Sequence, residues 1–142
     1  MTYNEYKEQT TKELNEFTEK NCIWAFSDEQ LKEALQEKNI TRDDFDKNYT
    51  GFIGGGAIRK DKVKEFNEMC ERHNNKLKEL MQDFKFAYDS IYYELANHEY
   101  GYTYDETDAL ASLGLSISDI VNNPTLNKAF CKAATEIKNS QY

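Results

Sequence analysis

The sequence lacks several features that define large classes of protein. It contains no apolar run approaching the roughly 20 residues that a membrane-spanning helix needs, so no membrane insertion is expected. Its first twelve residues are polar, which predicts no secretory signal. Basic residues are scarce: 18 Lys and Arg stand against 26 Asp and Glu, a formal net charge of −8. Direct binding to nucleic acid or to an anionic membrane is therefore not expected, because both rely on clustered positive charge.

Cysteine and histidine are also few. Cys22, Cys70 and Cys131 are far apart and odd in number, which predicts free thiols in a reducing compartment, here the cytoplasm of a bacterial host. Each lies among apolar neighbours, so we expect three small buried side chains. The only histidines are His73 and His98, which limits the metal sites that the chain can build.

What is present indicates one small helical domain. Residues 1–142 form a chain of common domain length, and we expect a single domain with an N-terminal helix over 2–20 and a core over about 22–135. Hydrophobic residues make up 39% of the chain and charged residues 31%. Ten Tyr and eight Phe supply the large apolar areas that a thin core needs.

Apolar spacing predicts mainly helices. The predicted fold class is α+β, mainly α-helical, with five to seven helices and a small two- or three-stranded β-sheet. The apolar run 22–26 is typical of a buried strand, and Ser27 with Gln30 is typical of a capping box that starts a helix. A long apolar stripe begins at position 63, is expected to bend near 82–83, and is expected to stop at Gly101.

Four of the six glycines lie between positions 51 and 56, in a segment that predicts two short strands meeting at a turn. The amides of Gly54, Gly55 and Gly56 could bind phosphate oxygens, with Arg59 and Lys60 adding positive charge. No Ser or Thr follows Lys60, so the phosphate-loop motif is absent. The alternative is a glycine turn or a tight backbone crossing with no ligand.

A second candidate segment runs from Glu94 to Asp105. Glu94 and His98 are four apart on one helix face, and with Asp105 they are candidate metal ligands. Alternatively, His98 serves a ligand pocket with three tyrosines that alternate along an extended segment; these are Tyr100, Tyr102 and Tyr104. The third interpretation is structural: His98 offsets a helix dipole and pairs with Glu94, while the tyrosines cover the edge of the core.

Nucleophilic catalysis is not favoured. The chain has no GxSxG elbow, and the nearest cysteine–histidine pair, Cys70 and His73, lies on a packed helical stripe where a thiol is poorly activated. We therefore expect a non-enzymatic protein that needs no cofactor, with a metal-dependent enzyme using Glu94, His98 and Asp105 as the minor alternative.

Three segments carry a resemblance to a known family. They are YELANHEYGYTYDETDALASLGL (93–115), WAFSDEQ (24–30) and IGGGAIRK (53–60). Together they resemble an uncharacterised family of small proteins from phages, plasmids and mostly Gram-positive hosts. Ala57 departs from its pattern, because a bulkier and often aromatic residue is typical there. The resemblance implies a mobile-element context and no activity.

These observations lead to two functional hypotheses. The first is an accessory protein that counters host defence by binding a basic host protein, such as a nuclease effector, through an acidic and Tyr-rich surface. The second is a site for a nucleotide-like molecule formed by the glycine turn, Arg59, Lys60, His98 and the three tyrosines. The second hypothesis requires these two regions of the sequence to lie together.

Overall fold

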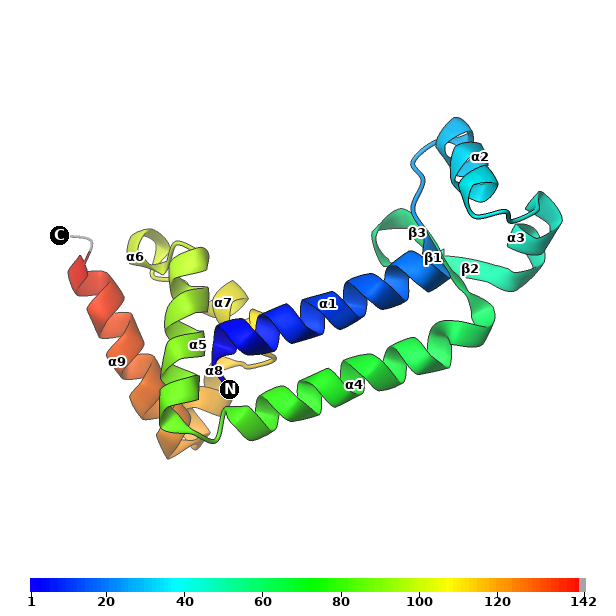
Figure 1. The fold of residues 1–142 in the computed structure, drawn as a ribbon. Helices are drawn as coiled ribbons and strands as arrows, with labels where there is room; N and C mark the ends of the chain where they lie inside the picture. Colours follow the sequence, from blue (N-terminus) through cyan, green and yellow to red (C-terminus); the bar gives the residue numbers. More distant parts are fainter. Residues whose placement is uncertain (141–142) are drawn as a thin grey trace. The chain divides into compact units, whose positions relative to one another are not determined.

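The computed structural model describes residues 1–140 and is mainly helical, with one small antiparallel sheet (Figure 1). The fold class is therefore as predicted, but residues 1–140 form nine α-helices instead of five to seven. None of these helices combines the length and the apolar character that crossing a bilayer requires.

The chain divides into two compact units. The sheet unit comprises residues 8–71, and the helical unit comprises residues 1–7 with the described residues from 72 onward. Helices α1 (Tyr3–Asn21) and α4 (Val63–Leu80) contribute residues to both units. The single domain expected from the sequence stays a prediction.

Three strands form the sheet of the sheet unit, in the order β1-β3-β2. Their bounds are Cys22–Ile23 for β1, Tyr49–Phe52 for β2 and Gly56–Arg59 for β3, and both pairings are antiparallel. A single 3-10 turn, Ile53–Gly55, joins β2 to β3, so the predicted glycine hairpin is confirmed. The predicted strand over 22–26 is wrong in its length, because only its first two residues pair with β3.

The two faces of this sheet pack differently. Ile23, Tyr49 and Ala57 lie on the face covered by α2 (Asp28–Glu37) and α3 (Arg42–Asn48). On the other face, the Phe52 ring meets the Phe66 ring edge-on at 4.8 Å. Alternate residues of a strand point to opposite faces, which is why one short hairpin contributes to two apolar layers.

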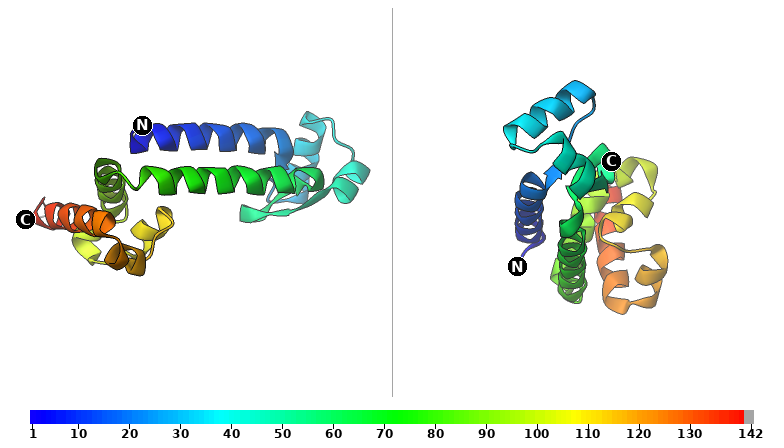
Figure 2. Two further views of the ribbon diagram at one scale, coloured as in Figure 1. Left: turned by 90° about the horizontal axis from the view of Figure 1, so that it is seen from below. Right: turned by 90° about the vertical axis from the view of Figure 1, so that its right-hand side faces the viewer.

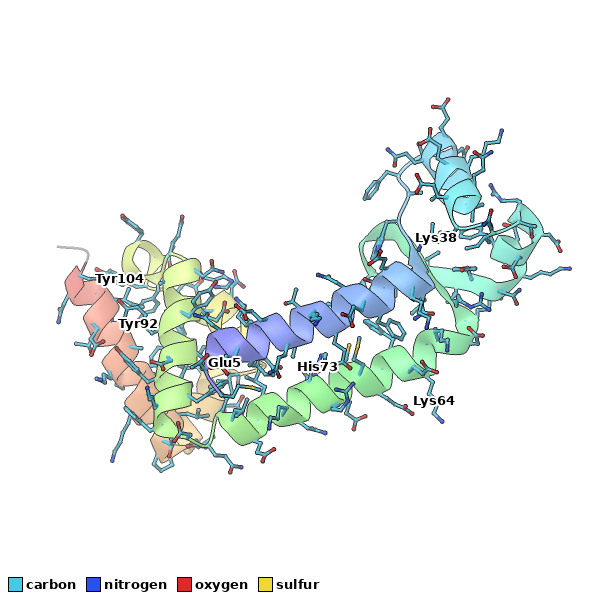
Figure 3. The ribbon with its side chains drawn as sticks, in the orientation of Figure 1. Glu5, Lys38, Lys64, His73, Tyr92 and Tyr104 are labelled. Carbon is cyan, nitrogen blue, oxygen red and sulfur yellow. The ribbon has the colours of Figure 1, made fainter. Side chains whose placement is uncertain are left out.

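Local hydrogen bonds hold the ends of the helices in the sheet unit. Ser27 Oγ accepts from Gln30 N at 3.1 Å, as predicted, but Gln30 Oε1 accepts from Phe26 N at 2.9 Å instead of from the cap residue itself. The ammonium of Lys38, labelled in Figure 3, donates to the carbonyls of Glu19 and Cys22. These two carbonyls belong to the end of α1 and the start of β1, so Lys38 also balances the negative end of that helix.

The helical unit is centred on two long helices that lie side by side, α5 (Phe84–Asn97) and α9 (Pro124–Ser140) (Figures 1 and 2). Ala129 and Ala133 of α9 are fully buried, as are Ile91 and Leu95 of α5. Small residues on α9 allow the larger side chains of α5 to approach closely.

Three short helices connect α5 to α9: α6 (Tyr100–Thr103), α7 (Thr107–Ser112) and α8 (Ile117–Asn122). The prediction of an extended segment over 102–104 is wrong, because α6 occupies it. The predicted stop at Gly101 is also wrong, since α5 ends at Asn97. Glu99 and Tyr104 both adopt the left-handed conformation, which non-glycine residues rarely do, and this explains why the sequence did not indicate a separate helical turn.

Side chains cap the starts of three helices in the helical unit. Asp83 caps α5 through a 3.0 Å bond from Phe86 N, which ends the long stripe where a bend was expected. Ser116 and Asp119 form a reciprocal capping box, and Asn123 caps α9 ahead of Pro124.

The prediction that all three cysteines are buried is confirmed only for Cys22. Cys70 is half-buried and Cys131 is exposed.

Candidate functional site

The glycine turn of the sheet unit is built around one indole ring. A Cβ placed on Gly56 would lie 2.4 Å from Cε3 of Trp24, closer than any real Cβ contact. Trp24 therefore packs directly on the backbone of β3, with its ring 5.6 Å from that of Phe52. Gly56 serves a close approach between backbone and side chain, which is one of the two interpretations that the sequence left open.

The neighbouring glycines set the shape of the turn. Gly54 and Gly55 have φ values of +76° and +85°, a region that L side chains rarely adopt. A Cβ on Gly55 would lie 3.9 Å from Cε1 of Phe26, so this turn also approaches the segment that follows β1. The segments 24–30 and 53–60, which are far apart in the sequence, thus pack together.

Three large apolar side chains remain exposed around this turn. Trp24 is 45% exposed, Phe26 is 81% exposed and Ile53 is 71% exposed. We call these three residues the aromatic surface. The sequence predicted a buried strand here and missed the exposure of Phe26, although its position directly before the helix cap Ser27 was a signal that the strand had ended. Exposed apolar residues gathered on one turn mark binding surfaces in soluble proteins.

The helix that follows this surface carries negative charge without neutralising partners. Four exposed carboxylates of α2 form no ion pair within residues 1–140; they are Asp28, Glu29, Glu33 and Glu37. Lys32 is the only basic residue of this helix. On α3, by contrast, Asp43 pairs with Lys47 at 3.1 Å and Asp46 with Arg42 at 3.2 Å. Four unpaired carboxylates of the sheet unit thus lie on the helix that begins two residues after Phe26.

Arg59 and Lys60, the predicted phosphate-binding cations, lie at the end of β3 and in the 3-10 turn after it. Arg59 Nε is 3.2 Å from Asp61 Oδ1, and the ion pair raises the pKa of Arg59 and lowers the pKa of Asp61. The guanidinium also lies 5.8 Å from the ring centroid of Tyr49. The charge of Arg59 is therefore already matched by a neighbour, which reduces what it can offer to a phosphate.

In the helical unit, Glu94 forms the centre of a buried polar cluster. It is 4% exposed, and its Oε1 accepts a 2.6 Å bond from the hydroxyl of Tyr3. Lys7 Nζ lies 3.6 Å from the same oxygen, and His98 Nδ1 lies 3.6 Å from Oε2. Burial and the Glu94 carboxylate raise the pKa of Tyr3 well above its usual range, so the phenol stays protonated. The cluster attaches the start of α1 to α5.

His98 caps the end of α5, and its ring is held from both sides. Nδ1 lies 2.9 Å from the carbonyl oxygen of Glu94, and Nε2 lies 3.5 Å from Oγ of Ser112. Nothing in the sequence indicated Ser112, which comes close only through the packing of α7 against α5. Its hydroxyl donates to Asp108 O at 3.0 Å, so it bonds to its own helix and is not prepared as a nucleophile.

Tyr100, Tyr102 and Tyr104 do not point to one side of an extended segment, as the sequence predicted. Tyr100 is buried, with its ring 6.1 Å from that of Tyr104, because residues four apart share a face of the helical turn. The ammonium of Lys138 lies 5.5 Å and 5.2 Å from these two ring centroids. Tyr102 points elsewhere and is 78% exposed. Figure 3 labels Tyr104 together with Tyr92 of α5.

Asp105, the third predicted metal ligand, caps the chain ahead of α7. Its Oδ1 accepts from Thr107 N at 3.0 Å, and this bond lowers the pKa of the carboxyl. Across residues 1–140, no group of three His, Cys, Asp or Glu side chains has an arrangement that could hold a metal ion. Glu94 directs its carboxylate to Tyr3, Lys7 and His98 instead.

The predicted ligand residues fall into two groups. Gly54, Gly55, Gly56, Arg59 and Lys60 belong to the sheet unit, where they surround the glycine turn. The second group, His98 with Tyr100, Tyr102 and Tyr104, belongs to the helical unit around α6. Each group is brought together within its own unit, and a joint pocket formed by both stays a prediction.

Comparison with known proteins adds one result to this geometry. No curated protein and no solved structure shows a significant match to the chain. A family of unknown function, DUF7659, matches residues 2–136. That match spans nearly the whole sequence, including α1, both segments that meet at the glycine turn, and the Glu94 cluster. The chain belongs to the DUF7659 family of unknown function.

Proposed function

We propose that this protein is a binding module that recognises another protein through the aromatic surface and the carboxylates of α2. The observation that carries the proposal is the exposure of Ile53, at 71%, on a turn that Trp24 holds in shape, and of Phe26, at 81%, in the segment packed beside that turn. A tightly built turn that presents apolar side chains to solvent favours recognition, because little conformational entropy is lost on binding.

The chemistry of the surface indicates the chemistry of its partner. Burial of the aromatic surface favours an apolar patch on the partner. The unpaired carboxylates of Asp28, Glu29, Glu33 and Glu37 favour Lys or Arg around that patch. We therefore propose a basic protein partner, which is also the partner expected from the net charge. We place the acidic surface on α2 of the sheet unit and not beside Tyr100, Tyr102 and Tyr104.

The wider biological role follows from the sequence resemblance. We propose that the protein acts in the cytoplasm of a bacterial host as an accessory protein of a mobile element. In that setting the basic partner would be a host defence protein, such as a nuclease effector, which the module inhibits by occupying its basic surface.

The test is affinity capture from a bacterial lysate with the full chain and two variants. The first variant combines Phe26→Ser with Ile53→Ser. The control is Val121→Ser, which removes another highly exposed apolar side chain (66%) from α8 in the helical unit. We expect proteins that bind the wild type and the control but are depleted at least about 10-fold by the double variant, because a binding hot spot contributes about 1.4 kcal/mol or more. Equal recovery by all three proteins would remove the aromatic surface from the proposal.

Two charge-reversal variants test whether the carboxylates of α2 contribute to partner binding. Glu29→Lys with Glu33→Lys changes α2, and Glu79→Lys with Asp89→Lys makes the same change on exposed residues of α4 and α5. The α2 pair is expected to slow association with the captured partner and to remove its salt dependence, whereas the control pair retains both properties. A partner whose binding is unaffected by the α2 pair would show that these carboxylates are only a solvated surface.

A further inference from the structure

Strand β2 forms an unprotected edge of the sheet. In the order β1-β3-β2 it pairs only with β3, and no backbone hydrogen bond within residues 1–140 reaches Thr50, Gly51 or Phe52 from any other segment. Alternate residues of such an edge direct their N–H and C=O groups away from the sheet. Thr50 and Gly51 are both exposed, so these groups are accessible.

The sequence around this edge lacks the usual protection against strand pairing. Edge strands commonly carry a lysine, a proline or a bulge that discourages another strand from joining. The eleven residues from Asn48 to Ile58 contain no charged residue and no proline, in a chain in which 31% of residues are charged. A neutral, exposed edge of this kind is a template for an added strand.

A groove accompanies the edge. It has a volume of about 540 Å³ and lies between β2 and the start of α4, lined by Phe52, Ile53, Val63 and Phe66 among others. The rings of Phe52 and Phe66, which meet edge-on, both line it. Side chains of an added strand point alternately toward and away from such a groove, so it would accept one apolar side chain at every second position.

Charge decides between a foreign strand and a second copy of this chain. The sheet unit holds 15 acidic and 10 basic residues, a net charge of −5, so two copies would repel each other across this edge. Two cations that flank β3 and the start of α4 are already paired: Lys62 lies 3.2 Å from Glu65, and Arg59 pairs with Asp61. Four carboxylates of α2 have no ion-pair partner within residues 1–140 and add negative charge to the same unit.

From this arrangement we propose that the partner contributes an extended segment that adds to β2 as a fourth strand, with an apolar residue in the groove and Lys or Arg beside it. This inference rests on the proposed function, because it names the mode by which that partner binds. The affinity would come from main-chain hydrogen bonds along Thr50 to Phe52, and the specificity from the groove and from α2.

The experiment selects ligands with a displayed library of random linear 12-residue peptides that lack tryptophan, using the full chain. Each selected peptide is synthesised unmodified and with its backbone amides N-methylated at either the odd or the even positions. Binding is followed by the fluorescence of Trp24, the only tryptophan of the chain, which lies against β3. Strand addition predicts that one methylation register weakens binding at least 10-fold while the other leaves it nearly unchanged, since only alternate amides face β2.

Two variants of the protein complete the test. Gly51→Lys places a charge on the open edge where an added Cβ meets no atom within 4 Å, and it is expected to weaken peptide binding at least 10-fold. Asn75→Lys adds the same charge to an exposed position of α4 in the helical unit and is expected to leave binding unchanged. The comparison of methylated peptides uses the wild-type chain, so it does not depend on the folding of either variant.

The remaining outcomes separate this inference from the proposed function. Peptides that bind, depend on Phe26 and tolerate both methylation registers would overturn strand addition and leave the binding module in place. A library that yields no binder, or binders that respond to neither Phe26→Ser nor Gly51→Lys, would overturn both. If the wild-type chain sediments as a dimer and the Gly51→Lys variant as a monomer, the edge binds a second copy of this chain. That result would overturn the proposal that a strand of another protein adds to β2.

Discussion

The indole of Trp24 occupies the space that a side chain on Gly56 would need. The two residues are 32 positions apart, yet the ring carbons approach the backbone so closely that glycine is the only residue that fits without displacing the ring. This contact holds the glycine turn against the segment that contains Phe26. It accounts for a glycine-rich motif by packing, while the apolar side chains around it remain available to a partner.

Gly56→Ala is expected to destabilise the sheet unit. A Cβ 2.4 Å from Trp24 forces the ring to move, and overpacking of this kind costs roughly 1–3 kcal/mol. Chemical denaturation followed by Trp24 fluorescence measures the loss, and the emission maximum of the native protein should shift to the red. The matched control is Gly51→Ala, where an added Cβ meets nothing within 4 Å. Equal stability of the two variants would contradict the observed packing.

The aromatic surface is expected to contribute little to stability. Phe26 is 81% exposed, so Phe26→Ser should change the free energy of unfolding by no more than about 0.5 kcal/mol. Leu95→Ala, in the core of the helical unit with no exposed area, should cost roughly 2–5 kcal/mol. Denaturant titration of both variants measures the difference. A large loss for Phe26→Ser would mean that this ring is held for folding and not for recognition.

The Tyr3–Glu94 bond predicts a loss of stability at high pH. Folding raises the pKa of Tyr3 above its unfolded value of about 10, so the folded state binds more protons than the unfolded state above that pH. The stabilisation is therefore complete below about pH 10 and is lost as the pH rises. Tyr88, whose pKa is raised to about 12 by its bond to Glu136, adds to the loss between about pH 10 and 12.

Tyr3→Phe isolates the first of these contributions. The variant should be less stable at neutral pH by about 1–3 kcal/mol, because a buried carboxylate oxygen loses its donor, and its stability should fall less steeply above pH 10. Tyr102→Phe, which changes a 78% exposed side chain, is the control and should follow the wild type. Thermal denaturation between pH 7 and 11 makes the comparison. Parallel curves for all three proteins would contradict the assignment of the alkaline loss to Tyr3.

The three thiols are expected to react at different rates. Cys131 is exposed and should be labelled first by a maleimide at neutral pH, whereas Cys22 is buried and should react only on unfolding. Burial raises the pKa of Cys22 and of Cys70, which lowers the thiolate fraction of both. Mass spectrometry of the labelled peptides gives the order. Cys131→Ser should abolish the fast phase, and rapid labelling of Cys22 in the native protein would contradict its burial.

Much of the local structure could be predicted from neighbouring residues. The helix caps at Ser27, Ser116 and Asn123 are determined by side chains that bond to amides two or three residues away, so the sequence alone indicates them. The hairpin at 51–56 could also be predicted from the sequence, because the positive φ angles at Gly54 and Gly55 favour glycine. The helix α6 was not, since it depends on left-handed conformations at Glu99 and Tyr104 that their residue types do not favour.

The sequence by itself determined the helical character of this protein, its caps, its glycine turn and its negative charge, because each depends on composition or on short-range periodicity. Only the tertiary structure decided that Phe26 is exposed, that Trp24 covers Gly56, and that Tyr3 donates to Glu94, 91 positions away. Burial and long-range contacts depend on which segments pack together, and that choice is made by the whole chain when it removes apolar surface from water.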